Sequence, residues 1–194
     1  MKKKVNEIFY SLQGEGYNTG TAAVFIRFSG CNLRCSFCDT KHQDGKLMSN
    51  EEIVDEVTKY PARLVILTGG EPTMYIDDDL LDKIHAKGRK IAIETNGTRN
   101  VNAKIDFITL SPKFEFTDNA RLYQTECDEL KVIFNSQNDM SLYASIKAKY
   151  KYIQPCATND EDINQENIAN AVRFVRENPE WRLSLQTQKI INIR

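Results

Sequence analysis

The chain has 194 residues and a net charge of −1, which excludes a broadly basic protein that binds nucleic acid. Apolar residues make up 41% of it, with only nine glycines and five prolines, which excludes collagen-like and disordered chains. A chain of this length buries about 70% of its unfolded surface, so we expect a single domain, residues 1–194. No run approaches the roughly 18 apolar residues of a membrane span, and the first residues lack a signal peptide's apolar region. We therefore expect a cytoplasmic protein.

Short apolar runs rich in Val, Ile and Phe recur along the chain, and each is followed by loop-forming residues. Such runs predict buried strands of a parallel sheet. In chain order they cover residues 23–28, 64–67, 91–93, 107–110, 130–134 and 152–153.

Three apolar stripes at helical spacing lie between or after these runs. The first follows Ser49 and Glu52, a capping-box pair, the second ends at Gly88, and the third ends at Asn178. The stripes are Ile53, Val54 and Val57, then Leu80, Leu81 and Ile84, then Ile168, Ala171, Val172 and Val175. This alternation predicts an α/β fold with a mostly parallel sheet or partial barrel. Because the unusual motifs directly follow predicted strands, we expect them to meet at one rim.

The cysteines carry the sharpest chemical signal. Their odd number, five, argues against a disulfide framework in a chain expected inside the cell, and Cys31, Cys35 and Cys38 lie within eight residues. A structural zinc site needs four ligands, commonly as two separated pairs, and His42 is the best fourth ligand here. The alternative is a 4Fe–4S cluster on three thiolates, which leaves one iron open. We favour the cluster because the spacing departs from the usual zinc pairings.

The C-x3-C-x2-C spacing, with Phe37 before the last cysteine, resembles the signature of radical S-adenosylmethionine enzymes. Residues 68–72, Thr-Gly-Gly-Glu-Pro, resemble the Gly-Gly-Glu-Pro segment of that superfamily. Two adjacent glycines let the backbone approach the methionine amino group of the cofactor closely.

Further segments narrow the resemblance to the 7-carboxy-7-deazaguanine synthase family. They are residues 8–16, 25–33, 38–40, 94–98, 111–113 and 185–187. The resemblance implies a single-domain partial (β/α) barrel and a carbon–nitrogen lyase. The implied reaction turns 6-carboxy-5,6,7,8-tetrahydropterin into 7-carboxy-7-deazaguanine, with loss of ammonia, in queuosine and deazapurine biosynthesis.

The resemblance also implies the partners of the reaction. They are a 4Fe–4S cluster, S-adenosylmethionine, Mg²⁺, an electron donor such as flavodoxin or ferredoxin, and a second copy of the chain in a homodimer. One electron from the reduced cluster would cleave S-adenosylmethionine, and the adenosyl radical would remove hydrogen from the pterin. The protein's own task would be to position the reactants and exclude solvent.

Roles follow residue by residue from the same resemblance. Cys31, Cys35 and Cys38 would hold the cluster, and Thr40 would bind Mg²⁺. The expected contacts to S-adenosylmethionine are Phe37, Cys38, Asp39, Gly70, Ser111, Pro112, Lys113, Gln154, Pro155, Cys156 and Ala157. The expected contacts to the substrate are Leu12, Gln13, Gly14, Arg27, Thr68, Gln188 and Arg194. A guanidinium such as that of Arg27 can grip a carboxylate with two hydrogen bonds.

Two positions depart from the family pattern. The family commonly has histidine where this chain has Gln188, and often proline where it has Arg194. The amide of Gln188 donates and accepts hydrogen bonds but cannot become charged. We therefore expect different details of substrate contact within the same reaction class.

Two other functions fit part of the sequence. A glycyl-radical enzyme activase shares the cysteine spacing, but it would not need residues 8–16 or the pair Asp39 and Thr40. A zinc-binding module without catalysis is the other alternative, and the brown colour of an iron–sulfur protein would exclude zinc alone.

Overall fold

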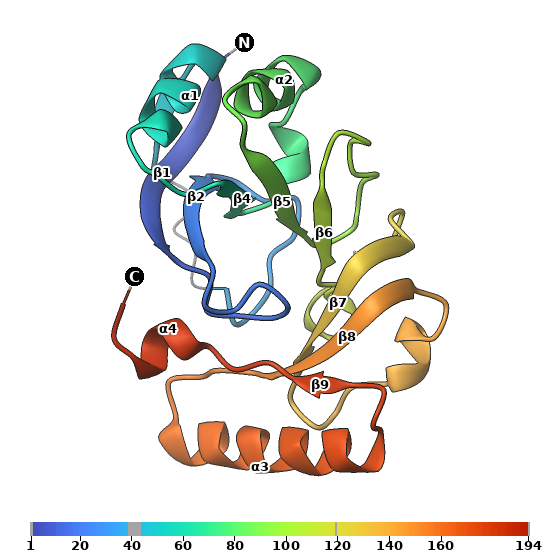
Figure 1. The fold of residues 1–194 in the computed structure, drawn as a ribbon. Helices are drawn as coiled ribbons and strands as arrows, with labels where there is room; N and C mark the ends of the chain where they lie inside the picture. The colour runs from blue at the N-terminus through green and yellow to red at the C-terminus, as the bar shows by residue number, and fades with distance from the viewer. Residues whose placement is uncertain (1, 39–43, 119, 194) are drawn as a thin grey trace.

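The computed structural model describes residues 2–38, 44–118 and 120–193, and in these ranges nine strands form one curved, open sheet (Figure 1). The order across the sheet is β3-β1-β2-β4-β5-β6-β7-β8-β9. The strands are β1 (Lys3–Leu12), β2 (Ala22–Phe28), β3 (Lys46–Met48), β4 (Leu64–Gly69), β5 (Lys90–Thr95), β6 (Phe107–Leu110), β7 (Glu126–Phe134), β8 (Lys147–Pro155) and β9 (Arg182–Leu183). The helices are α1 (Asn50–Thr58), α2 (Asp78–Ala86), α3 (Glu161–Glu177) and α4 (Thr187–Ile190), with short 3-10 turns η1 (Pro72–Met74), η2 (Phe114–Phe116) and η3 (Met140–Tyr143).

Every strand pairing from β2 to β9 is parallel, which confirms the predicted mostly parallel α/β sheet. Each of the six predicted apolar runs lies inside a strand. The edge of the sheet differs, because β1 runs antiparallel to both β2 and β3. Neither β1 nor β3 was predicted from the sequence. Strand β1 mixes buried with half-exposed and exposed residues, so it contains no continuous apolar run.

The predicted helices form at the expected positions. Helix α1 has the full capping box, in which Ser49 Oγ accepts from Glu52 N and Glu52 Oε2 accepts from Ser49 N. Gly88 follows the last turn of α2 with a φ of +70°, a conformation that glycine adopts without strain. The stripe predicted on α3 is wrong at Val172, which is 38% exposed. Ala171 and Val175 instead pack on the core of the β7–β9 region, together with Phe174.

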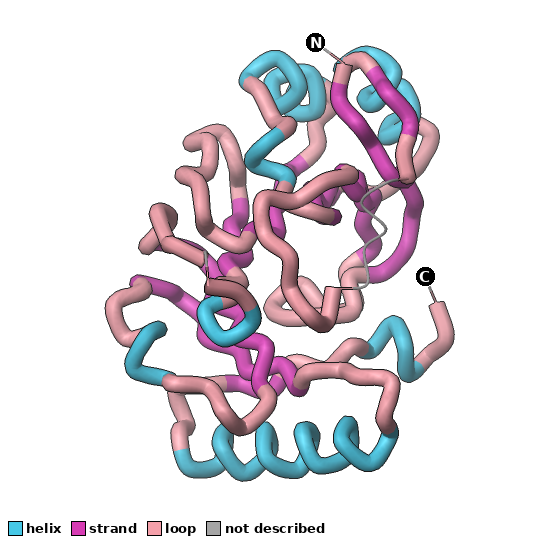
Figure 2. Tube along the Cα trace, turned by 180° about the vertical axis from the view of Figure 1, so that it is seen from behind, coloured by secondary structure: helices cyan, strands magenta, loops and turns pink. Residues whose placement is uncertain are grey.

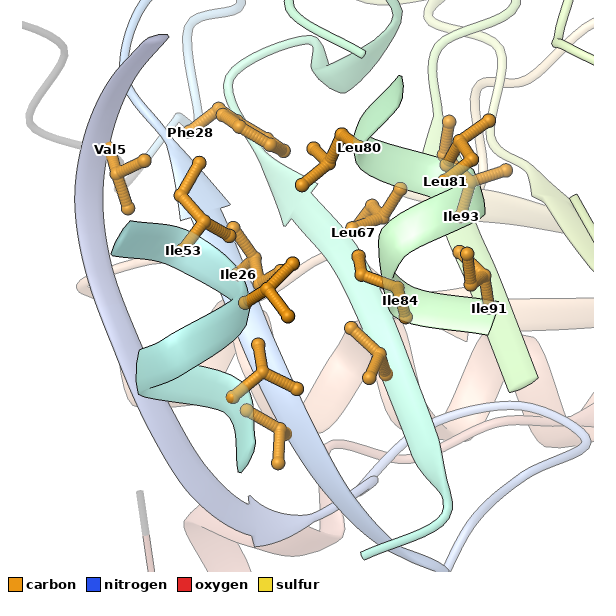
Figure 3. Close-up of a cluster of buried hydrophobic side chains, with 14 of the residues drawn as sticks. Val5, Ile26, Phe28, Ile53, Leu67, Leu80, Leu81, Ile84, Ile91 and Ile93 are labelled. Atoms are coloured by element: carbon orange, nitrogen blue, oxygen red, sulfur yellow. The ribbon is translucent and has the colours of Figure 1, made fainter. Parts of the chain in front are cut away.

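Helices α1, α2 and α3 cover the outer face of the sheet. Figure 3 shows Ile53 of α1 near Val5 and Ile26, and Leu80, Leu81 and Ile84 of α2 over the strands that carry Leu67, Ile91 and Ile93. Helix α3 packs against β8 and β9, at the far end of the sheet in both the front and the rear view (Figures 1 and 2). None of the described helices is both long and apolar enough to cross a membrane.

Candidate active site

A cavity of about 1060 Å³ opens where loops from the strand ends meet segments near both chain ends. All three clustered cysteines line it. So do all the other expected site residues within the described ranges except Pro112. These lining residues are Leu12, Gln13, Gly14, Arg27, Phe37, Thr68, Gly70, Ser111, Lys113, Gln154, Pro155, Cys156, Ala157 and Gln188. Asp39, Thr40, His42 and Arg194 lie outside the described residues.

The loop that carries the cysteines packs tightly on the two glycines after β4. Glu71 N donates to Gly30 O at 3.0 Å, and Gly70 N donates to Phe28 O at 3.0 Å. A Cβ on Gly70 would lie only 1.8 Å from Gly30 O, so glycine is required for this close backbone approach. The approach places the Gly-Gly-Glu-Pro segment directly beside Cys31.

The cysteine sulfurs lie in a polar, partly buried setting. Cys31 Sγ accepts from Leu33 N at 3.4 Å and from Asn96 Nδ2 at 3.7 Å. Burial raises the pKa of Cys31 and of Cys35, and the positive charge of Lys113 opposes the rise at Cys35. Burial also lowers the pKa of Lys113 to about 8, and its Nζ donates to Ser111 Oγ at 2.7 Å.

The three thiols and the hydrogen-bond donors beside Cys31 suit an iron–sulfur cluster. Within the described ranges, no three His, Cys, Asp or Glu side chains are grouped so that they could hold one metal ion. A zinc ion draws its ligands to about 2.0–2.3 Å from one centre, whereas a cluster takes each thiolate on a separate iron. Proteins tune iron–sulfur clusters through hydrogen bonds to the cysteine sulfurs, such as those that Cys31 Sγ accepts. The donor set and spacing therefore suit a three-cysteine cluster.

Glu71 organises the loops around the cysteines, although the sequence analysis gave it no role. Its carboxylate is buried and accepts from Asn96 N at 2.8 Å and from Thr95 Oγ1 at 2.8 Å. It also accepts from Thr73 Oγ1 at 2.6 Å. Glu71 thereby joins the end of β5 to the turn after β4.

The predicted meeting of the site motifs at one rim of the sheet is incomplete, because Gln13 and Gly14 do not follow the C-terminal end of a parallel strand. Antiparallel β1 ends at Leu12 beside Ala22, at the start of β2, whereas the cysteines follow the end of β2. The chain then folds inward, and Gln13 Nε2 donates to Glu94 Oε1 at 2.9 Å. Thr68 Oγ1 donates to Glu94 Oε2 at 2.7 Å, so one carboxylate orients two of the expected substrate contacts.

A buried ion pair lies beside Glu94. Lys131 Nζ is 2.5 Å from Glu15 Oε2 and 3.8 Å from Glu94 Oε1. Burial opposes the charge of Glu15, but Lys131 and the hydrogen bonds to Glu15 lower its pKa to about 2. Burial also opposes the charge of Lys131, but Glu15, Glu94 and Glu129 outweigh it and raise the pKa.

The C-terminal segment contacts the loop that carries Gly14 and Glu15. Gln186 Nε2 and Gln188 Nε2 donate to Glu15 Oε1 at 2.9 and 3.1 Å, and Thr187 Oγ1 donates to Gly14 O at 2.8 Å. The Oε1 atom of Gln188 is buried without a hydrogen-bond partner in the described structure. The amide direction follows from Glu15, because a carboxylate must face the NH₂ group.

Arg27 lies on β2 and lines the cavity next to an aromatic pair. Its Nε donates to Glu7 Oε1 at 2.9 Å, and its Cζ lies 5.8 Å from the centre of the Phe9 ring. Phe9 stacks on Phe25 with ring centres 4.9 Å apart. Because a guanidinium carries five N–H donors, the contact with Glu7 orients Arg27 and uses only one of them.

Comparison with known proteins agrees with this geometry. Residues 25–113 match the family described as the radical SAM superfamily. The chain is 54% identical to the 7-carboxy-7-deazaguanine synthase of Bacteroides thetaiotaomicron over 194 residues, covering 100% of both chains. It is 39% identical to the protein of the same name from Burkholderia multivorans over 216 residues, again covering 100% of both.

The chain belongs to the 7-carboxy-7-deazaguanine synthase family. A solved structure, described as QueE from Escherichia coli, superposes with a TM-score of 0.78 at 26% identity and covers 95% of this chain and 94% of that one. The protein SuiB from Streptococcus suis shares the fold alone, with a TM-score of 0.52 and 17% identity over 80% of this chain and 44% of that one. As a radical S-adenosylmethionine enzyme of this synthase family, the chain uses a 4Fe–4S cluster, S-adenosylmethionine and Mg²⁺.

Four charged residues have roles in this synthase-family site that the sequence did not predict. Glu15, Glu71 and Glu94 lie inside the matched segments, but nothing in their spacing reveals what they contact. Lys131 carries a usable signal, because a lysine inside the apolar run 130–134 must be paired if that strand is buried. Its partner Glu15 lies 116 residues away in sequence.

Proposed function

We propose that this chain converts 6-carboxy-5,6,7,8-tetrahydropterin into 7-carboxy-7-deazaguanine, with loss of ammonia, in deazapurine biosynthesis. The observation that carries the proposal is the cavity of about 1060 Å³, where three thiols, a close glycine segment and a set of oriented polar side chains meet. Sites for drug-sized ligands commonly measure about 300–1,000 Å³, so this space suits a cofactor together with a bicyclic substrate.

In this proposal one side of the cavity holds the cofactors. Cys31, Cys35 and Cys38 would hold the cluster, and the backbone at Gly70 would admit the methionine end of S-adenosylmethionine. The remaining contacts to that cofactor would come from Phe37, Asp39, Ser111, Pro112, Lys113, Gln154, Pro155, Cys156 and Ala157. Together the cluster and S-adenosylmethionine supply the one-electron chemistry that removes hydrogen from the substrate.

The chain's own residues would hold the pterin on the other side. Glu94 fixes the side chains of Gln13 and Thr68, so these groups meet the substrate already oriented. Arg27 would bind the pterin carboxylate, and Gln188, which Glu15 holds in place, would lie beside the substrate. Leu12, Gly14 and Arg194 would complete the contacts.

Magnesium would bind next to the substrate through Thr40. A hydroxyl is a hard oxygen ligand that suits Mg²⁺, which keeps several waters and needs few protein oxygens. The substrate carboxylate would then supply another oxygen.

We further propose the protein partners of the reaction and the compartment in which it takes place. Each turnover cycle needs a reduced cluster, so a one-electron carrier protein such as flavodoxin or ferredoxin would serve as donor. We also propose that two copies of the chain form a homodimer. A reducing compartment such as the cytoplasm suits the five free cysteines.

The test is an anaerobic assay of the iron-reconstituted protein with the pterin, S-adenosylmethionine, Mg²⁺ and dithionite. We expect the wild-type protein and Cys127→Ala each to form 7-carboxy-7-deazaguanine and ammonia in a one-to-one ratio. Cys127 serves as the control because its thiol lies outside the residues that line the cavity. Cys31→Ala, Cys35→Ala and Cys38→Ala should lose both the iron and the product. A brown, iron-loaded protein that cleaves S-adenosylmethionine but leaves the pterin unchanged would overturn the substrate assignment and favour the activase. A colourless protein that binds zinc would overturn the reaction class.

A further inference from the structure

The loop between β1 and β2, residues 13–21, carries two of the expected substrate contacts, Gln13 and Gly14. We call it the 13–21 loop. Gln13 N donates to Thr21 O at 2.8 Å, and Gly20 N donates to Gln13 O at 2.7 Å. These bonds close the base of the loop, so the orientation of its tip depends on contacts with other elements.

Two consecutive backbone amides at the tip donate to buried side chains of the β7–β9 region. Tyr17 N donates to Glu129 Oε2 on β7 at 2.7 Å, and Gly16 N donates to Ser184 Oγ, just after β9, at 2.9 Å. Glu129 is only 2% exposed. A hydrogen bond from an N–H to a carboxylate is stronger than one to a neutral hydroxyl. Glu129 is therefore the stronger of the two anchors.

The loop fits closely against Glu129. Gly16 has a φ of +65°, and a Cβ added to it would overlap Glu129 Oε1, so the backbone lies directly against the carboxylate. The ring of Tyr17 stacks on Tyr150 with centres 4.3 Å apart and on Phe107 with centres 5.5 Å apart. Tyr150 is the β8 residue opposite Glu129 in the register of the sheet. The amide and the ring of Tyr17 are thus both held by this part of the sheet.

Glu129 belongs to the same buried charged group as Lys131 but stands outside the cavity. The two residues are two positions apart on β7, so their side chains lie on one face of the sheet. Burial raises the pKa of Glu129, and Lys131 and the N–H of Tyr17 oppose the rise. Lys131 lines the cavity, whereas Glu129 is not among the lining residues. Glu129 can therefore affect a ligand in the cavity only through the residues that it holds.

We propose that Glu129 is a positioning residue for the substrate: by holding Tyr17 N, it sets the place of Gln13 and Gly14 in the cavity. The proposal rests on the proposed function, which assigns these two residues to the pterin. Displacing a binding group by about 1 Å can cost as much as about 100-fold in rate, so an anchor of this kind matters although it touches no ligand. The expected contacts to S-adenosylmethionine lie outside the 13–21 loop and should not depend on Glu129.

The experiment compares three variants of the reconstituted protein with wild type. Glu129→Leu removes the acceptor for Tyr17 N, and Glu129→Gln keeps an oxygen acceptor on a side chain of the same length. The control is Glu126→Leu, the same change at an exposed position of the same strand. Anaerobic calorimetry without a reductant measures the affinities for 6-carboxytetrahydropterin and for S-adenosylmethionine separately. Hydrogen exchange of the backbone amides, followed by mass spectrometry, reports on the loop in the same proteins without ligands.

We expect Glu129→Leu to bind the pterin at least about tenfold more weakly than wild type, because its contacts are no longer held in place. Its affinity for S-adenosylmethionine should stay within about twofold of wild type, because those contacts do not depend on the loop. The amides of residues 14–20 should exchange faster, and those of β2 and β4 should not change. Glu129→Gln should recover most of the pterin affinity, and Glu126→Leu should match wild type throughout.

A fourth variant disturbs the same contact from the side of the loop. Gly16→Ala leaves Glu129 and β7 intact, but its Cβ forces the loop away from the carboxylate. We expect it to show the same selective loss of pterin affinity and the same faster exchange in residues 14–20. This variant decides the question even if Glu129→Leu does not fold.

Equal losses of pterin and S-adenosylmethionine affinity in Glu129→Leu and Gly16→Ala would overturn the proposal, and so would unchanged pterin affinity in both. A Glu129→Gln protein as weak as Glu129→Leu would also overturn it, because the acceptor for Tyr17 N is then not what matters. A wild-type protein that binds no pterin would contradict the proposed function, while the exchange measurement would still decide whether Glu129 holds the loop.

Discussion

Asn96 is held in one orientation at the cysteine loop. Its Oδ1 accepts from both Thr98 N and Thr98 Oγ1, so its Nδ2 must point to Cys31 Sγ and to Asn32 Oδ1. Hydrogen bonds to sulfur stabilise the more negative, reduced state of an iron–sulfur cluster. With Cys31 as a cluster ligand, as we propose, Asn96 is a positioning residue that makes the cluster easier to reduce.

We predict that Asn96→Ala shifts the midpoint potential of the cluster to a more negative value while iron content stays near wild type. A redox titration followed by electron paramagnetic resonance measures the shift. Asn102→Ala is the matched control, because Asn102 bonds Asp78 instead of a cysteine. An unchanged potential in an iron-loaded Asn96→Ala protein would assign Asn96 a purely structural role.

Arg27→Ala should weaken pterin binding far more than S-adenosylmethionine binding. Losing a hydrogen bond to a charged group costs about 1.5–3 kcal/mol, or roughly one to two orders of magnitude in affinity. Arg27→Lys should recover only part of the loss, because an ammonium lacks the planar fork. Both affinities are measured on the same variant by calorimetry. Equal losses of the two would mean that Arg27, through Glu7 and Phe9, supports the fold.

At the scale of elements, the ion pair of Lys131 and Glu15 joins β7 to the loop after β1. Removing one partner of a buried pair leaves a buried charge, which costs about 3–5 kcal/mol. We predict this loss of unfolding free energy for Lys131→Met, measured by urea denaturation. The double variant Lys131→Met with Glu15→Gln should lose less than the sum of the two single changes. Strictly additive losses would show that the two charges do not interact.

The same pair predicts a pH dependence of stability. The pKa of Glu15 falls from its usual 4.5 to about 2 on folding. Because the folded-state pKa is the lower one, the stabilisation is fully present above pH 4.5 and is lost as the pH falls towards 2. Glu15→Gln should therefore be less stable than wild type at neutral pH, and the difference should vanish near the acid end. Urea denaturation across this range measures it. A difference that is independent of pH would indicate lost packing instead of lost charge.

At the scale of the whole molecule, segments near the two chain ends together build the side of the cavity that we propose for the substrate. Thr187 N and Oγ1 both donate to Gly14 O, and Gly16 N donates to Ser184 Oγ. Strands β3 and β9 lie at opposite ends of the strand order, so the sheet does not close on itself. The loop after β1 and the C-terminal segment therefore cover the open side of this partial barrel.

The sequence predicted those parts of the fold that local patterns determine. Apolar runs such as residues 64–67 predicted the parallel strands, and Ser49 with Glu52 predicted the start of a helix. Strand β1 escaped prediction because its half-exposed residues form no apolar run. The contact of Gln13 with Glu94 also escaped, because it depends on the antiparallel direction of β1, which no local pattern encodes.

The candidate site, like the fold, was predicted only in part from the sequence. The three thiols and the expected ligand contacts in the cavity were predicted through the family resemblance, whereas Glu15, Glu94 and Lys131, which also line it, were not. Buried charges such as Glu71 and Lys131 gain their meaning from partners distant in sequence, and only the fold brings these partners together.

We propose that one cavity holds the cluster, S-adenosylmethionine and the pterin together. An anaerobic crystal structure of the reconstituted protein, grown with S-adenosylmethionine and 6-carboxytetrahydropterin, tests it most directly. We expect a four-iron cluster on the sulfurs of Cys31, Cys35 and Cys38, with the pterin between Gln13, Thr68 and Arg27. A single metal ion at the cysteines, or a pterin bound outside this cavity, would contradict the account.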